Sequence, residues 1–177
     1  MKLAGVMIAL VFVLAGCADK GNVFIALDSD FASFRSWPTV ALGSEPLPGH
    51  PPGPRYGYLS HAAPRGATAF PVGTMIVKTI EPLDMPATSW EVFAMAKRGG
   101  GFNANGARDW EFFRLRIVDD SPVILTRGIF AFDPDSDAGV GYGSGGSVLG
   151  QLCNSCHGIP ESAATDHVLS EALRPGL

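Results

Sequence analysis

The chain has 177 residues and a formal net charge of −4, with 13 Lys and Arg against 17 Asp and Glu. Hydrophobic residues make up 46% of it and include eleven Phe and three Trp, which is ample for the core of one domain of ordinary size. The basic residues form no cluster, so composition and charge argue against nucleic acid as a partner.

The first residues predict export from a bacterial cytoplasm. Lys2 precedes an apolar run that is too short to span a membrane as a helix. The sequence LAGC at residues 14–17 resembles the lipobox of bacterial lipoproteins. We therefore expect a lipoprotein signal peptide over residues 1–16 and a lipid on Cys17, followed by a tether to residue 23. The lipid would anchor the protein to a membrane, on the periplasmic or outer-membrane side. An ordinary cleaved signal peptide is the alternative.

The expected domain covers residues 24–177 and begins with a short helix. Asp28 is a suitable N-cap, and Trp37-Pro38 ends the helix. Apolar residues at helical spacing are Phe24, Leu27, Phe31 and Phe34. Residues 43–54 contain five Pro and three Gly, which predicts an irregular loop.

Strands are expected in the middle of the chain. Segments rich in β-branched and aromatic residues alternate there with clusters of Pro, Gly and Asn. These segments are residues 55–61, 73–80, 89–97, 109–118 and 128–132. No segment of helix length lies between them, which favours an antiparallel meander. A second helix is expected over residues 147–156.

The most specific motif is C-x-x-C-H, formed by Cys153, Cys156 and His157 near the end of the chain. This spacing attaches a c-type haem through two thioether bonds and supplies an axial imidazole to its iron. The alternatives are a dithiol redox pair and half of a zinc site. With Cys17 lipidated and the other two cysteines on the haem, none of the three cysteines is left for a disulfide. The expected fold class is therefore α+β, a mainly antiparallel sheet with a short N-terminal helix and a C-terminal helix carrying the haem c motif.

The group on the opposite side of the iron from His157 would decide the function, because a sixth protein ligand suits electron transfer and an open site suits a substrate or gas. Candidate sixth ligands are Met75, Met85, Met95, His50, His61 and His167. No pattern singles out one of them. Aromatic residues that can wall a haem pocket or fill the core of the sheet are Trp90, Phe93, Phe102, Trp110, Phe112, Phe113, Phe130 and Phe132.

Lys78 stands out within the strand expected over residues 73–80. Two-residue alternation places it on the same face as Ile76 and Ile80. If that face is buried, desolvation favours the neutral, nucleophilic amine. If the other face is the inner one, Lys78 is solvated.

Several segments resemble the cytochrome P-460 family. Residues 70–78, FPVGTMIVK, are similar to the strand that carries the haem-linked lysine of cytochrome P-460. Trp37-Pro38, followed by Tyr58-Leu59 and Phe70-Pro71, resembles the N-terminal half of that family, and residues 153–157 with DHVLS at 166–170 resemble its haem segment and tail. The resemblance covers most of the mature chain in the same order. It departs from the family pattern at His167 and Leu169, in the loop over 43–54 and at Gly99 to Gly101.

The resemblance implies a predominantly antiparallel β protein, usually a dimer, that holds one five-coordinate haem c. Cytochrome P-460 oxidises hydroxylamine to nitrogen oxides and has a lysine cross-linked to the porphyrin; the related β-type cytochromes c′ lack this link and bind NO or CO. By position, Lys78 would be the cross-linked lysine and Glu161 the distal carboxylate that relays protons. The expected partners are a small nitrogenous substrate or diatomic gas, a periplasmic redox partner and the membrane. A haem c protein that binds NO or CO or transfers electrons without hydroxylamine turnover is the alternative.

Overall fold

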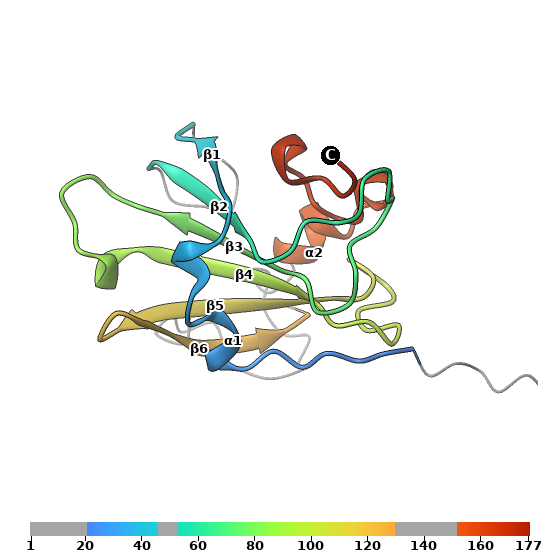
Figure 1. The fold of residues 1–177 in the computed structure, drawn as a ribbon, viewed down its shortest axis with the longest axis horizontal. Coiled ribbons are helices and arrows are strands. Elements are labelled where there is room, and N and C mark those ends of the chain that lie inside the picture. Colours follow the sequence, from blue (N-terminus) through green and yellow to red (C-terminus); the bar gives the residue numbers. More distant parts are fainter. Residues whose placement is uncertain (1–20, 46–52, 130–151) are drawn as a thin grey trace, which may run out of the picture.

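The computed structural model describes residues 21–45, 53–129 and 152–177, and its centre is a six-stranded antiparallel sheet (Figure 1). The strands are β1 (Thr39–Gly43), β2 (Arg55–Leu59), β3 (Met75–Ile80), β4 (Glu91–Lys97), β5 (Trp110–Val118) and β6 (Ser121–Gly128). Their order in the sheet is their order in the chain, so the sheet is a meander.

The expected α+β class is wrong. Within the described ranges the regular structure is mostly this sheet, and the longest helices, α2 (Leu152–His157) and η4 (Pro160–Thr165), have six residues each. Of the C-terminal helix that was expected over residues 147–156, the structure describes α2, which ends at His157; residues 147–151 lie outside the described ranges. Beyond His157 the chain leaves the helix, and Pro160 begins a separate 3-10 turn.

The N-terminal helix is shorter than expected. It consists of α1 (Asp28–Phe31) and a separate 3-10 turn, η1 (Phe34–Ser36). Asp28 does not cap this helix, because its side chain accepts a hydrogen bond from the backbone N–H of Ile124 on β6 at 2.8 Å. A contact with a distant strand thus replaces the local cap that the sequence suggested.

The two ends of the described chain cover opposite faces of the sheet. On β3, Met75 and Val77 face the N-terminal segment, where Phe31 and Phe34 are fully buried. Ile76 belongs to a second cluster on the other face, which the C-terminal segment covers. Both faces are therefore packed, and alternate side chains of each strand enter different environments.

The C-terminal segment comprises α2, η4 and η5 (Glu171–Leu173), and it lies at one end of the sheet beside the connection from β2 to β3 (Figure 1). Gly57 on β2 makes this close approach possible, because a Cβ there would come within 2.6 Å of Leu173. Gly66 donates its N–H to the carbonyl of Gly176, which ties the β2–β3 connection to the end of the chain.

Two strands differ from expectation. β1 was not expected, and β6 lies before the segment predicted at 128–132, of which residues 130–132 are outside the description. A two-residue turn joins β5 to β6, with Asp119 and Asp120 both at positive φ. Consecutive positive φ values are typical of the type I′ turns that connect tight hairpins.

None of the helices in the described ranges is long and apolar enough to cross a membrane. The predicted signal peptide over residues 1–16, the lipid site Cys17 and most of the tether fall outside these ranges.

Candidate functional site

The C-x-x-C-H motif is held in place by the asparagine between its cysteines. The Asn154 side-chain oxygen accepts hydrogen bonds from the backbone N–H of Ala107 and from the side-chain amide of Asn103, each at 2.9 Å. Its nitrogen donates back to the Asn103 side chain at 2.9 Å. Gly106 lies against this amide, with room for no more than hydrogen, because a Cβ would come within 2.4 Å of Asn154. The β4–β5 connection therefore fixes the position of α2.

His157 has the protonation and orientation that a metal ligand needs. Its Nδ1 donates to the backbone carbonyl of His167 at 2.8 Å, and because a carbonyl can only accept, the proton lies on Nδ1 and Nε2 is the nitrogen that can bind a metal. Burial lowers the pKa of His157, more strongly than the opposing bond to His167, so the neutral imidazole is favoured. The ring lies 5.5 Å from that of Phe112 on β5.

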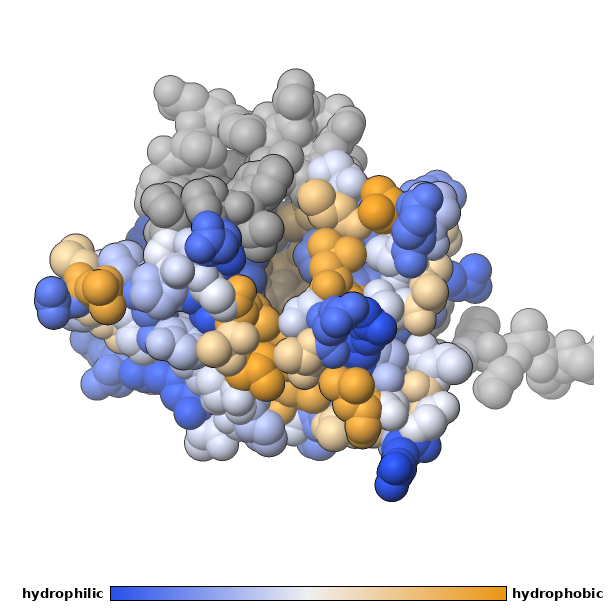
Figure 2. Space-filling view, turned by 90° about the horizontal axis from the view of Figure 1, so that it is seen from above, coloured by the Kyte–Doolittle hydropathy of each residue, from blue (hydrophilic) through white to orange (hydrophobic). Residues whose placement is uncertain are grey.

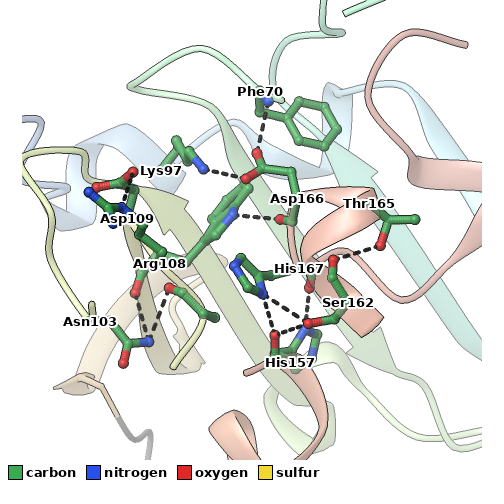
Figure 3. Close-up of polar contacts among 12 residues, drawn as sticks. Phe70, Lys97, Asn103, Arg108, Asp109, His157, Ser162, Thr165, Asp166 and His167 are labelled. Carbon is green, nitrogen blue, oxygen red and sulfur yellow. Dashed lines mark hydrogen bonds and ion pairs between the residues drawn. The ribbon is translucent and has the colours of Figure 1, made fainter. Parts of the chain in front are cut away.

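His167, whose chemistry the sequence left open, bonds back to the motif. Its Nδ1 lies 2.7 Å from the carbonyl of His157 and 2.9 Å from the hydroxyl of Ser162 (Figure 3). Together with the bond from His157, this makes a reciprocal pair between two histidines ten residues apart in sequence. His167 is thus a buried positioning residue in this structure.

A buried ion pair anchors the segment that carries His167. Lys97 at the end of β4 lies 2.5 Å from Asp166, and both side chains are 8% exposed (Figure 3). The same aspartate accepts the backbone N–H of Phe70 at 2.8 Å, and its carbonyl accepts the indole N–H of Trp110 at 2.7 Å. Asp166 and His167 both have positive φ, a strained conformation that these contacts stabilise.

Lys78 lies on the side of β3 that faces the motif. It is partly buried, with its ammonium group 5.1 Å from the centre of the Phe93 ring. Burial, followed by the neighbouring charge of Arg55, lowers the pKa of Lys78 from 10.5 to about 7, against smaller opposing effects of Cys153, Glu91 and Cys156. The structure therefore brings together four of the predicted residues, Lys78, Cys153, Cys156 and His157.

Apolar side chains surround this group. Cys153 packs against a cluster that includes Ile76, Met95 and Phe112, all on the same side of the sheet as Lys78. Viewed from above, on the side where the C-terminal segment lies, hydrophobic residues border a hollow in the surface (Figure 2). Such a lining excludes water and suits a large apolar ligand.

Glu161 is an exposed residue of the C-terminal segment. It is exposed in the first turn of η4, whereas the resemblance implied a carboxylate in a poorly solvated distal pocket. An exposed carboxylate can exchange protons with water, but its position gives no sign of the enclosed relay.

The expected sixth ligands and aromatic walls are divided between the two faces. Met95 and Phe112 lie in the cluster beside Cys153, whereas Met75 and Phe113 lie in the cluster on the opposite face. Met85 and His61 are exposed. His50, Phe130 and Phe132 lie outside the described residues.

The residues present fit a haem c. Two thiols, of Cys153 and Cys156, lie on one short helix, and the histidine that follows is partly buried with Nε2 as its metal-binding nitrogen. No three His, Cys, Asp or Glu side chains in the described ranges gather in a way that could hold a metal ion by themselves. Haem iron needs only one side-chain ligand from this segment, His157, because the porphyrin supplies the other ligands of a five-coordinate iron.

Four residues that contribute to this region were not predicted from the sequence, namely Arg55, Asn154, Lys97 and Asp166. Asn154 occupies a variable position of the motif. Lys97 and Asp166 pair with each other across a long stretch of sequence, and Arg55 reaches this region only through its place on β2. The sequence offers two signals here, Lys97 at the end of an apolar strand and Asp166 directly before His167, but neither signal identifies the partner of the residue.

Comparisons with protein-family models, with curated proteins and with solved structures give no match for this chain.

Proposed function

We propose that the protein is a lipid-anchored, periplasm-facing cytochrome that holds one haem c through Cys153, Cys156 and His157, on the face of the sheet that carries Lys78. The observation that supports this most strongly is the convergence of Lys78 with the motif, since the two are far apart in sequence. The lipid on Cys17 and the export that it implies rest on the sequence alone.

Each residue has a distinct part in this proposal. His157 keeps its proton on Nδ1, directed at the carbonyl of His167, and presents Nε2 to the iron. Lys78, with a pKa of about 7, is neutral in about half of the molecules at pH 7, and a neutral amine is a nucleophile. When bound, the haem supplies a redox-active iron that can take electrons from a small nitrogenous substrate.

The reaction that we propose is oxidation of hydroxylamine to nitrogen oxides with a lysine-modified haem, as the resemblance to cytochrome P-460 implies. Lys78 supports it, because its amine lies beside the attachment cysteines in a largely apolar setting. A periplasmic redox partner would then accept the electrons.

The exposure of Glu161 favours a second candidate function, the binding of NO or CO, or electron transfer, without hydroxylamine turnover. An apolar site without an enclosed carboxylate binds a diatomic gas readily but lacks a direct path for substrate protons.

Optical spectra of the matured protein test the main proposal. A haem linked to Lys78 is expected to give a reduced Soret band well to the red of an ordinary haem c, and Lys78→Ala should abolish the shift. Lys20→Ala, which removes another lysine of the mature chain, is the control and should leave the spectrum unchanged. An ordinary haem c spectrum in the wild type would rule out the link.

Turnover separates the two candidate functions. If the wild type oxidises hydroxylamine and Glu161 relays protons, Glu161→Gln should slow the reaction by about a hundredfold while haem content stays the same. Glu171→Gln, a change at another exposed glutamate of the C-terminal segment, should have no effect. A wild type that binds CO but does not consume hydroxylamine would establish the second function.

A further inference from the structure

Arg55 on β2 is a buried cation, and two of its guanidinium nitrogens have no hydrogen-bond partner within the described chain. The residue is 3% exposed, and its Nε and Nη1 are buried without a hydrogen-bond partner. A guanidinium stays charged at any physiological pH, and a buried donor without an acceptor is costly. Such a group in a folded protein points to an acceptor that the described side chains do not supply.

Arg55 faces the candidate site rather than the N-terminal side of the sheet. Alternation along β2 places it on the same side as Gly57 and Leu59, against which the C-terminal segment packs. Gly57 pairs with Lys78 on β3, so Arg55 and Lys78 are diagonal neighbours on one face. The effect of Arg55 on the pKa of Lys78 reflects this proximity.

The surrounding charges leave this side of the sheet positive. Glu91 on β4 is the nearby carboxylate, and it lies 3.4 Å from Arg114 on β5. Arg114 itself has a buried Nη1 without a partner. The groups on α2 that face Lys78 are Cys153, Cys156 and His157, and the imidazole is neutral by preference. The buried guanidinium of Arg55, beside the partly buried amine of Lys78, therefore favours a bound anion.

We propose that the guanidinium of Arg55 binds a carboxylate, and that this carboxylate is a propionate of the haem held at Cys153 and Cys156. The inference rests on the proposed function, because it needs the haem to be present. A guanidinium forms strong, charge-assisted hydrogen bonds with a carboxylate, and either of the two unpartnered nitrogens of Arg55 can donate one. The same chemistry would admit a free oxyanion such as phosphate or nitrite, so the test must distinguish the two sources.

The experiment compares matured wild type with Arg55→Gln, Arg55→Lys and Arg116→Gln. Arg116 is a matched control, because it lies on the same side of β5 as Arg114 but is exposed. Intact mass first counts the covalent haem in each protein. Resonance Raman spectra then report the bending mode of the propionate, which responds to a hydrogen bond on that carboxylate. The pH dependence of the reduction potential does not by itself test the contact between Arg55 and the propionate, because loss of Arg55 also changes the pKa of Lys78.

The expected result is one haem per chain in all four proteins, with the propionate mode shifted in Arg55→Gln, shifted less in Arg55→Lys and unchanged in Arg116→Gln. An unchanged mode in Arg55→Gln with haem attached overturns the inference and leaves the proposed function standing. Wild-type protein without haem overturns both, through the mass measurement. If added phosphate or nitrite alters the wild-type spectrum but not that of Arg55→Gln, and the propionate mode is the same in both, a free anion is the ligand and the propionate assignment is wrong.

Discussion

The amine of Lys78 combines an apolar setting with a cationic neighbour. Both effects disfavour the charged form, and they lower its pKa to about 7, from 10.5 for an ordinary lysine. At the residue scale, the reactivity of Lys78 therefore depends on two features of the site, its apolar surroundings and the neighbouring charge of Arg55.

We predict that Lys78 reacts with a trace acylating reagent with a half-maximal rate near pH 7. The neutral fraction rises as the pH increases through the pKa, so the rate climbs between about pH 6 and 8. The measurement is competitive acetylation followed by peptide mass spectrometry, on protein made without haem maturation so that no lysine is already linked. Lys20 is the internal reference, and a Lys78 midpoint near 10 would contradict the described burial.

The same pKa shift has a consequence for stability. Between pH 7 and 10.5 the unfolded chain binds a proton at Lys78 that the folded chain does not, so the contribution of Lys78 to the free energy of unfolding increases with pH in this range. Lys78→Met should therefore stabilise the protein most below pH 7, and urea unfolding at pH 6.5 and 9.5 would show the difference shrinking.

At the element scale, the position of α2 depends on the contact between Gly106 and Asn154. We predict that Gly106→Ala destabilises the protein by about 1–3 kcal/mol, because the new methyl group overlaps the Asn154 amide and strains the packing. Chemical denaturation measures the loss. Asn154→Ala in the Gly106→Ala background should recover part of it, and strictly additive losses would show that the two side chains do not compete for space.

The ion pair between β4 and the C-terminal segment gives a second prediction at this scale. Lys97→Met leaves Asp166 buried without its cation and should cost about 3–5 kcal/mol of unfolding free energy. Adding Asp166→Asn should restore much of the stability, since Asn tolerates the positive φ of this position and carries no charge. A Lys97→Met protein as stable as the wild type would mean that the pair is solvated.

The elements differ in how well the sequence predicted them. The apolar residues over 75–80 predicted β3, because that signal is local. The same pattern left open whether the face that carries Lys78 is buried, and in the structure both faces of β3 are packed. β6 was missed because Pro122 and Arg127 interrupt its apolar pattern, although Pro122 is buried and Arg127 is bound by Glu111 on the adjacent strand. The N-terminal helix is shorter than predicted, since the contact of Asp28 with β6 replaces a local cap. Contacts with distant parts of the chain decide where these elements form and end, and a single sequence does not reveal such contacts.

At the scale of the whole molecule, the chain wraps its two ends over opposite faces of one sheet. The N-terminal segment buries Phe31 and Phe34 on one face, and the C-terminal segment brings the C-x-x-C-H motif to the other. Cys153, Cys156 and His157 could be predicted because their chemistry follows from short spacing in sequence. The buried guanidinium of Arg55 and the bond from His157 to His167 depend on this wrapping, and no local pattern indicated them.

The intact mass of the full chain, expressed with haem-maturation machinery, tests the central claim most directly. The account predicts one covalent haem in addition to the lipidated mature polypeptide, lost when both Cys153 and Cys156 are replaced by Ser. A wild-type protein whose mass is that of the polypeptide and its acyl groups alone would contradict it.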